Sequence, residues 1–298
     1  MTLYNGWIIL DKPIGMSSND AVQKIKRELG KQNKVGHAGT LDPLAQGVLP
    51  IAVGEATKTT QYLMDASKKY IFTIKWGEER STGDAEGEVI INGGRIPELL
   101  EIENILHKFI GTINQVPPIY SALKINGQPA YKLARKGLEV DIKSRKIEIY
   151  SLKILDHNEI EGLTKLEVSC GKGTYIRSLS IDIARSLGTH GYTTYLNRTK
   201  VGKFLLENTI TLANLINLVH NDPTKLQLLP VNYGLGDILA IELTAEQAES
   251  LKHGLSIFLE NHLHVCESTV QVLNNGILQA LAYLEKGKCK PIRVFNLN

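Results

Sequence analysis

A short stretch of the 298-residue chain holds residue types suited to nucleophilic chemistry. Asp42 is the only acidic residue between Gly36 and Gly47, and Pro43 after it disfavours a helical backbone at Asp42. His37 lies five residues upstream of this carboxylate. Glycines beside a His and an Asp let a ligand approach the backbone closely. Each residue alone is ordinary in a turn, but together they predict a ligand-binding loop with one carboxylate.

A second group is Gly171-Lys-Gly-Thr-Tyr175-Ile-Arg177. It is no phosphate-binding Walker loop, because a glycine follows the Gly-Lys pair and the earlier glycine of that motif is missing. Arg177 falls in the first turn of a predicted helix, where a cation opposes the helix dipole. A residue that breaks a local rule is a functional candidate. Arg177 therefore either pairs with a buried carboxylate or holds its head in water.

Regular elements on both sides are expected to position these groups. A short apolar strand over 7–10 precedes a helix over 20–29, with Ser17, Ser18 and Asn19 as possible N-caps. Residues 36–47 are expected to lack regular structure, because they contain three glycines and a proline. Strands are predicted over 48–53, 70–76 and within 140–170, and helices over 97–109, 176–187 and 211–219. Ile71 interrupts the alternation in 70–76, so we expect that strand to be covered on both faces.

The composition changes near residue 222, where Pro and Gly residues indicate a linker up to Gly236. Beyond it, Thr244-Ala-Glu-Gln247 is a capping box that opens a short helix. Strands are expected over 262–266, 269–273, 277–283 and 291–295. The sequence therefore predicts an α+β protein with a large domain at 1–236 and a small β-rich module at 237–298.

Overall composition excludes several classes of protein. Apolar residues are 43% and charged residues 22%, which is ordinary for a globular protein. Three cysteines are too few for a disulfide scaffold and favour a reducing compartment. No apolar run approaches the roughly 18 residues of a membrane span, so a cytoplasmic protein is expected. His262-Leu-His264-Val-Cys266 could bind a metal, but no second ligand cluster accompanies it, and we expect no metal.

Six separated motifs together resemble one family. They are Leu10-Asp-Lys-Pro-Ile-Gly-Met-Ser-Ser-Asn19, the loop 36–50, Gly54-Glu-Ala-Thr-Lys58, Lys69-Tyr70, Ser121-Ala-Leu-Lys124 and Gly173-Thr-Tyr-Ile-Arg177. In order and spacing, over about residues 6–205, they resemble the bacterial tRNA pseudouridine-55 synthase family, TruB. Departures are Ala38 and Gln46, where relatives often have Thr, and the segment 189–194, where many relatives carry Gly-Ala-His.

The resemblance implies a fold and a site. It implies a pseudouridine-synthase catalytic domain with a mixed, mostly antiparallel sheet, and a PUA-like RNA-binding module at the C-terminus. The implied nucleophile is Asp42, with Arg177 as its partner and Tyr70 stacked on the target base. Tyr175 and Leu196 map to further contacts with the uridine. His37 maps to the histidine that holds the T loop open, and Lys12 and Pro13 map to structural positions.

The implied reaction breaks the N1–C1′ bond of uridine, turns the base and rejoins it through C5. Atoms are neither gained nor lost, so no cofactor is expected. An aspartate can supply the nucleophile, either by attack on C1′ or by promoting a glycal. The target base must leave its stack, and aromatic stacking on Tyr70 would compensate. Tyr70 is also a candidate base for removing the C5 proton.

The expected partner is the T stem-loop of tRNA, with no membrane, no obligate protein partner and a monomeric state. The chain has 34 Lys and Arg against 31 Asp and Glu, a net charge of only +3, so an RNA-binding face requires local clusters. Four clusters fit, although each could be only a solvated surface. They are residues 24–34, then Lys132, Arg135 and Lys136, then Lys143, Arg145 and Lys146, and in the tail Lys286, Lys288, Lys290 and Arg293.

Other functions remain open on sequence grounds. A guide-RNA-dependent pseudouridine synthase subunit shares the catalytic motifs, although residues 121–124 and the short tail favour the stand-alone type. A non-catalytic RNA-folding protein would not need Asp42, Tyr70 and Arg177, although a tRNA-folding role can coexist with catalysis. A generic hydrolase lacks its signature residues. Because every catalytic motif precedes residue 200, the last 60 or so residues are expected to add affinity and not chemistry.

Overall fold

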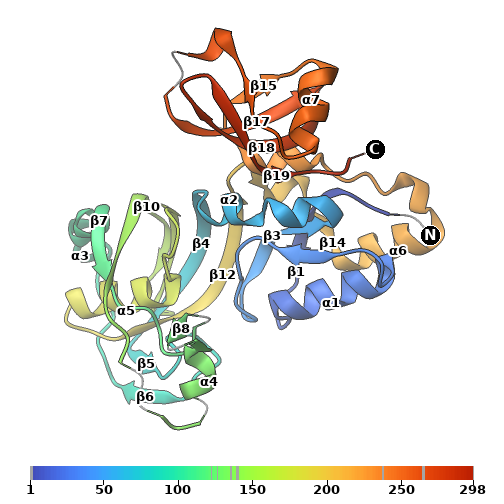
Figure 1. Ribbon diagram of the computed structural model, residues 1–298. Helices are drawn as coiled ribbons and strands as arrows, with labels where there is room; N and C mark the ends of the chain where they lie inside the picture. Colours follow the sequence, from blue (N-terminus) through green and yellow to red (C-terminus); the bar gives the residue numbers. More distant parts are fainter. Residues whose placement is uncertain are drawn as a thin grey trace.

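The computed structural model describes residues 3–121, 123–125, 127–134, 136–138, 141–236, 238–263 and 266–297. Within these residues the chain forms one ten-stranded sheet, one five-stranded sheet and two small hairpins. Figure 1 shows the five-stranded sheet, in orange and red, stacked at one end of the larger sheet. No helix in the described ranges is both long and apolar enough to cross a membrane.

The large sheet is mixed and mostly antiparallel, as the sequence predicts. Its strands follow the order β14 (Ile210–Thr211), β1 (Gly6–Lys12), β3 (Gln46–Val53), β12 (Gly191–Val201), β4 (Lys68–Trp76), β11 (Leu163–Cys170), β10 (Arg145–Asn158) and β7 (Gly111–Gln115). β2 (Val35–His37) pairs with β3, and β13 (Phe204–Leu205) pairs with β12. Only the β1–β14 and β3–β12 pairs are parallel among those recorded for this sheet.

Strand β4 lies at the centre of this sheet, between β12 and β11. Its burial alternates strictly, with Tyr70, Phe72, Ile74 and Trp76 buried and the residues between them half-buried. The expectation of full cover on both faces is therefore wrong in degree. Ile71 is half-buried, since the side of β4 opposite the core is only partly covered.

The predicted helices form where the apolar residues recur at helical spacing. α1 (Ser18–Leu29) begins after Ser17, whose hydroxyl accepts the backbone N–H of Asp20. Figure 1 places α1 and α6 (Leu212–Asn221) beside the β1–β3 half of the sheet, and α3 (Leu99–Leu106) and α5 (Ile176–Ser186) beside the β10–β11 half. A short 3₁₀ turn, η2 (His107–Phe109), extends α3, so the predicted helix over 97–109 is largely confirmed.

Smaller elements occupy the connections. η1 (Gly54–Lys58) and α2 (Thr60–Met64) follow β3, and β5 (Glu78–Arg80) pairs with β6 (Val89–Asn92). β8 (Lys124–Ile125) and β9 (Gln128–Pro129) form a hairpin before α4 (Ala130–Ala134). Within the predicted strand-rich stretch 140–170, the first strand, β10, begins at Arg145. Val140 itself and Ala122 of the motif at 121–124 lie outside the described residues.

The predicted linker is structured and packed. It contains η4 (Pro223–Lys225) and η5 (Val231–Leu235), whereas η3 (Leu206–Asn208) precedes α6. Trp7 and Leu229 exchange backbone hydrogen bonds of 2.9 Å, and the Trp7 indole donates to the Val231 carbonyl at 3.0 Å. The linker is therefore packed against the large sheet, because Val231 and Leu235 are buried in one cluster with Trp7 of β1.

The C-terminal sheet has the order β15 (Ala240–Glu242), β17 (Ser268–Asn274), β18 (Ile277–Glu285), β19 (Lys288–Val294) and β16 (Ile257–Phe258). α7 (Ala245–Lys252) starts with the predicted capping box of Thr244 and Gln247. The strand expected over 262–266 is wrong where it is described, since His262 ends the 3₁₀ turn η6 (Glu260–His262). His264 and Val265 lie outside the described residues. The sequence analysis missed β15 and β16, which are too short to show periodicity.

The two sheets share part of their core. Leu278, Leu281 and Phe295 of the C-terminal sheet pack in one buried cluster with Trp7 and Phe204 of the large sheet. Lys58 also donates to the Val294 carbonyl at 3.0 Å. The proposed boundary between 236 and 237 stays a prediction, and Asp237 itself lies outside the described residues.

Candidate active site

The loop that carries Asp42 ends where the two halves of the large sheet meet. β3 and β12 touch through two parallel residue pairs only, Asn197 with Gln46 and Arg198 with Gly47. A Cβ on Gly47 would lie 2.2 Å from Asn197 Oδ1 and 2.4 Å from the Arg198 carbonyl, and Gly47 has a φ of +100°. A glycine is required here because the strands approach too closely for any side chain.

Part of the predicted loop is regular. His37 belongs to β2 and pairs with Ile51 of β3, so only the segment from Ala38 to Ala45 is irregular. The expectation of a loop over all of 36–47 is therefore wrong at both ends. Val35, Gly36 and His37 form a short strand despite the glycine, because they can pair with the edge of β3.

Neighbouring elements fix the backbone around Asp42. The Ser18 hydroxyl accepts the Leu41 N–H at 2.8 Å and donates to the Leu41 carbonyl at 2.9 Å. On the other side, the Gly15 N–H donates to the Pro43 carbonyl at 2.8 Å. The Asp42 carbonyl accepts the Ala45 N–H at 3.1 Å, which closes a turn. The first motif of the chain thus holds the residues on both sides of the carboxylate.

Lys12 confirms the structural position that the resemblance implies. Its side chain is fully buried, and Nζ donates to the carbonyls of Pro13 at 2.8 Å and Met16 at 2.6 Å. It also reaches the Pro43 carbonyl at 3.4 Å. Burial lowers the pKa of Lys12 from 10.5 to about 8, while the nearby charge of Asp42 opposes that shift.

Asp42 and Arg177 meet as predicted. Arg177 Nε lies 2.9 Å from Asp42 Oδ2, an ion pair that lacks the alignment of a hydrogen bond. The Asp42 side chain is 32% exposed, whereas that of Arg177 is 4% exposed. Arg177 is in the first turn of α5, and its guanidinium also donates to the Thr82 and Tyr120 carbonyls at 3.0 and 2.9 Å. Of the two interpretations of Arg177, the buried ion pair is confirmed.

Asp84 is a second carboxylate on the same arginine, and the sequence analysis missed it. Asp84 Oδ2 lies 3.4 Å from Arg177 Nη1. Asp84 Oδ1 accepts the Thr82 hydroxyl at 2.5 Å and the Glu86 N–H at 3.0 Å. Unlike Asp42, its side chain is only 4% exposed. No local pattern singled out Asp84, because its role comes from Arg177, which is distant in the sequence.

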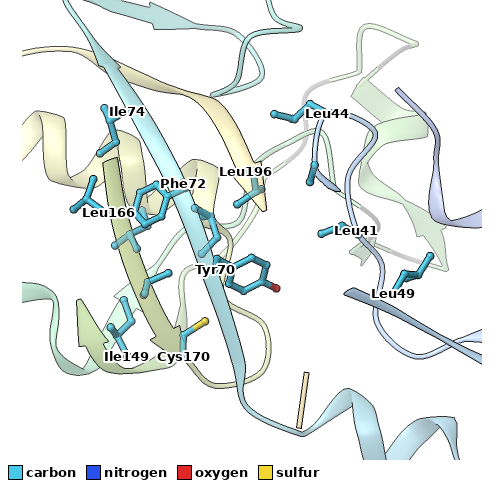
Figure 2. Packing of buried hydrophobic residues seen from close by; sticks show 14 of the residues in the cluster. Leu41, Leu44, Leu49, Tyr70, Phe72, Ile74, Ile149, Leu166, Cys170 and Leu196 are labelled. Carbon is cyan, nitrogen blue, oxygen red and sulfur yellow. The ribbon is translucent and has the colours of Figure 1, made fainter. Parts of the chain in front are cut away.

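Tyr70 and Leu196 face the same loop. Figure 2 shows the Tyr70 ring pointing from β4 toward the segment that carries Leu41, with Leu196 on the same side of the strand. All three residues belong to the main buried cluster. Burial raises the pKa of the Tyr70 hydroxyl, and the positive charge of Arg198 opposes that rise. The hydroxyl therefore stays protonated at neutral pH.

Tyr175 stands at the N-terminal end of α5, two residues before Arg177. Its backbone N–H donates to Gln115 Oε1 at 2.8 Å, and its carbonyl accepts Gln115 Nε2 at 3.1 Å. The Arg145 guanidinium lies over the Tyr175 ring, 5.0 Å from its centre, and donates to the Gly173 carbonyl. Tyr175 is thus held by residues of β7 and β10, in the half of the sheet that does not contain β3.

His37 is half-buried, and its Nδ1 has no hydrogen-bond partner within the described part of the chain. Burial lowers its pKa, and the positive charge of Arg198 lowers it further. His37 is therefore a neutral imidazole. No recorded contact joins its side chain to Asp42 or Tyr175, so the structure places it at the edge of the loop.

Arg198 is a further residue that sequence reasoning missed as a functional group. It lies on β12 two residues after Leu196 and is 1% exposed. No local pattern marked Arg198, because its surroundings come from β3 and β4, which are distant in the sequence.

The described residues contain no group of three or more His, Cys, Asp or Glu side chains that could hold a metal. His264 of the possible ligand set lies outside them. What the site does hold is one partly exposed carboxylate beside a buried arginine, with an aromatic ring nearby. That arrangement suits a nucleophilic aspartate.

Comparison with known proteins gives a consistent result. The family model described as "TruB family pseudouridylate synthase (N terminal domain)" matches residues 26–176. A tRNA pseudouridine synthase B of Caulobacter sp. (strain K31) is 43% identical over 301 residues, which cover 98% of this chain and 96% of that protein. One from Ehrlichia ruminantium (strain Gardel) is 42% identical and covers 98% of this chain and 99% of its own length.

Solved structures resemble the fold. A chain from the crystal structure of a Cbf5-Nop10-Gar1 complex has a TM-score of 0.72 and 25% identity, covering 98% of this chain and 84% of that one. A chain from an H/ACA RNP bound to a substrate RNA containing 2′-deoxyuridine has a TM-score of 0.73 and 24% identity, covering 98% and 85%.

Proposed function

The chain belongs to the TruB family of pseudouridylate synthases, and from this membership we propose that it converts uridine to pseudouridine at position 55, in the T loop of tRNA. The relatives named tRNA pseudouridine synthase B support tRNA as the substrate. The observation that carries the mechanism is the 2.9 Å contact between Asp42 Oδ2 and Arg177 Nε.

The reaction is an isomerisation that balances within the nucleotide. The N1–C1′ bond breaks, the C5–C1′ bond forms, N1 gains a proton and C5 loses one. Asp42 supplies the carboxylate, whether it attacks C1′ or promotes a glycal. The Arg177 guanidinium places a positive charge 2.9 Å from that carboxylate, and its fork orients the side chain. Asp84 on the far side of Arg177 holds that guanidinium in place.

Tyr70 is proposed to receive the flipped base. Taking a base out of its stack costs a few kcal/mol, and stacking on an aromatic side chain returns about 1–3 kcal/mol. The Tyr70 hydroxyl is protonated in the free protein, because burial raises its pKa. For Tyr70 to accept the C5 proton, its phenolate would need the positive charge of Arg198 to stabilise it.

The remaining predicted substrate contacts surround this pair. Leu196 shares the buried cluster of Tyr70 and would pack against the base or its sugar. Tyr175 is held at the start of α5 by Gln115 and would contact the uridine from the other side. His37 would contact the opened T loop from the edge of β2 with its neutral ring.

A stand-alone enzyme is favoured over a guide-RNA-dependent subunit. The relatives at 42–43% identity match almost the whole chain and bear the name of a tRNA-modifying enzyme. The structures from protein complexes and from the H/ACA RNP are 24–25% identical. We therefore propose that the protein acts as a cytoplasmic monomer, away from membranes, without a cofactor or an obligate protein partner.

Pseudouridine mapping on RNA incubated with the purified protein alone tests this function. The substrate is a T stem-loop, and the control is the same stem-loop with cytidine at the target position. We expect one pseudouridine at the position that corresponds to 55 and none elsewhere. Absence of product with the protein alone, and its appearance after addition of a guide RNA and partner proteins, would instead support the guide-dependent alternative.

A further inference from the structure

We propose that Arg198 is a positioning residue that locks the Asp42 loop and the Tyr70 side chain onto the junction of the two sheet halves. The proposal rests on the proposed function, since it concerns the geometry of that same site. Arg198 makes no recorded ion pair or hydrogen bond with the Asp42 side chain, and no contact with the substrate is assigned to it. Its role is to set where the nucleophile and the stacking ring stand relative to each other.

The burial of Arg198 is the first observation. The residue is 1% exposed and is among the largest fully buried side chains of the described chain. No carboxylate in the described ranges lies within ion-pair distance of it, whereas Arg177 has two. A buried charge without a counter-ion is expensive unless hydrogen bonds satisfy it fully. The fold therefore retains this cation for the bonds that it makes.

Those bonds bracket the nucleophile. Nη2 donates to the Gly39 carbonyl at 3.0 Å and Nη1 to the Thr40 carbonyl at 3.2 Å, both before Asp42 in the sequence. Nε donates to the Val48 carbonyl at 2.8 Å, after it. One planar group thus joins the two ends of the loop. A lysine at this position has one nitrogen and cannot reach all three carbonyls in the same geometry.

The second connection is to the stacking tyrosine. Arg198 stands opposite Tyr70 in the β12–β4 register and opposite Gly47 in the β12–β3 register. As directly opposed cross-strand partners, the two buried residues lie on the same face of the sheet. A single residue therefore connects β4, which carries the ring, with the loop that carries the carboxylate. β3 and β12 pair through only two residue pairs here, so few other hydrogen bonds could fix the position of the loop relative to β4.

The consequence is a division of labour between two buried arginines. Arg177 contacts the Asp42 carboxylate and acts on its charge. Arg198 binds backbone carbonyls and acts on its position. A displacement of about 1 Å at a reacting group costs roughly 10²-fold in rate. Loss of Arg198 should therefore slow the chemical step much more than it weakens RNA binding.

Hydrogen exchange tests the positional role without any substrate. The reporters are the Ala38, Leu41 and Ala45 amides, which are hydrogen-bonded within the loop or to its neighbours. The variants are Arg198→Lys and Arg198→Met, and the control is Ile102→Ala, which destabilises a fully buried site on α3. We expect the exchange rates of the reporter amides to rise at least about tenfold more than the exchange rates of the β11 amides. The control should show no such selective rise.

Equal rises in the loop and in β11 for the Arg198 variants would mean that Arg198 supports only global stability, and would overturn the proposal. Unchanged exchange at the reporters would overturn it as well. If Arg198→Met does not fold, Arg198→Lys decides the matter, since it keeps the charge and loses the fork. This result does not depend on whether the wild-type protein modifies tRNA.

Single-turnover kinetics on the T stem-loop then link position to chemistry. We expect the rate for bound RNA to fall roughly 10²-fold in Arg198→Met, with Arg198→Lys between it and the wild type, while the Kd for RNA changes less than about threefold. An inactive wild type would contradict the proposed function. An active wild type with an unaltered rate in both variants would contradict only the role of Arg198.

Discussion

Buried charge distinguishes the region before residue 237 from the C-terminal module. Among the described residues of 3–236, six charged side chains are buried, namely Lys12, Lys68, Glu79, Asp84, Arg177 and Arg198. In the described part of the module, the buried polar residues are Gln271 and Gln279, and neither is charged. Burying ions is unfavourable unless they are paired or hydrogen-bonded. Three of the six, Lys12, Arg177 and Arg198, contact the segment around Asp42, the proposed nucleophile.

The module instead carries its charge on the surface. Lys286, Lys288, Lys290 and Arg293 are all exposed, on β19 and on the turn that joins it to β18. Exposed cations suit phosphate groups, which bind by attraction and counterion release and need no fixed pocket. From this difference we infer that buried ions serve the proposed chemistry and that the exposed cations of the module serve RNA affinity.

Removal of the Asp42 charge should have the largest effect. Asp42→Asn keeps the shape of the side chain, so the variant should fold and bind tRNA within about tenfold of the wild type. Its single-turnover formation of pseudouridine should be undetectable, because the amide is no nucleophile. Mass spectrometry must exclude deamidation back to Asp. Sustained turnover by an Asp42→Asn sample verified in this way would place the nucleophile elsewhere.

Replacement of Arg177 should have the second-largest effect on the rate. Arg177→Lys keeps a charge but loses the contacts to the Thr82 and Tyr120 carbonyls, and it grips Asp42 less firmly. Charge-assisted hydrogen bonds contribute about 1.5–3 kcal/mol each, so we expect a rate roughly 10²-fold below the wild type. Rapid-quench assays at saturating RNA measure it. A rate equal to the wild type would show that charge alone suffices.

Asp84 should matter less than Asp42. Asp84→Asn removes one of two carboxylates from Arg177 and leaves the other in place. We expect the single-turnover rate to fall about tenfold, which corresponds to ~1.4 kcal/mol of barrier. Thermal unfolding run alongside separates this effect from loss of stability. If Asp84→Asn is as inactive as Asp42→Asn, the two carboxylates share the nucleophilic role.

Removing the four exposed positive charges of the module should weaken RNA binding and leave the rate of the chemical step nearly unchanged. With Lys286, Lys288, Lys290 and Arg293 all changed to Gln, the slope of log affinity against log salt should decrease by up to about 3, at 0.7–0.9 for each phosphate contact. The rate for bound RNA should stay within about twofold of the wild type. Lys225→Gln is the control, since Asp222 already pairs with that exposed lysine. An unchanged slope would place the RNA on another basic cluster.

The smallest predicted effect is a pH dependence of stability from Lys12. Its folded pKa is about 8 and its ordinary value is 10.5. Between these values the unfolded chain holds a proton that the folded chain has released, so stability from this group rises with pH. The wild type should gain about 1 kcal/mol more than Lys12→Gln between pH 7 and 9. Urea unfolding at both pH values measures the difference, and parallel curves would contradict the shift.

Much of the fold and part of the candidate site could be predicted from the sequence. The helix over 20–29, the strands over 48–53 and 70–76 and the capping box at Thr244 follow local rules of capping and periodicity. The pairing of Asp42 with Arg177 was also predicted and is confirmed. The unfavourable helix position marked Arg177 as unusual, and the family resemblance supplied Asp42 as its partner.

The remainder depends on contacts that are distant in the sequence. Asp84 and Arg198 gain their roles from Arg177 and from the loop 38–45, and no local pattern marks such partners. The predicted linker is structured because residues near 230 meet β1 across more than 220 positions. The shared core also means that cutting the chain near residue 237 would expose apolar side chains on both sides. Surface charge substitution is therefore the cleaner test of the module.

Measuring both the RNA affinity and the chemical rate of the same three proteins tests the separation of chemistry from affinity most directly. The Kd for a tRNA transcript and the single-turnover rate at saturating RNA are determined for the wild type, for Asp42→Asn and for the fourfold Gln variant of the module. We predict that Asp42→Asn loses the rate and keeps the Kd within about tenfold, while the module variant weakens the Kd and keeps the rate. A module variant that loses the rate at saturating RNA, or an Asp42→Asn protein that keeps it, would contradict the account.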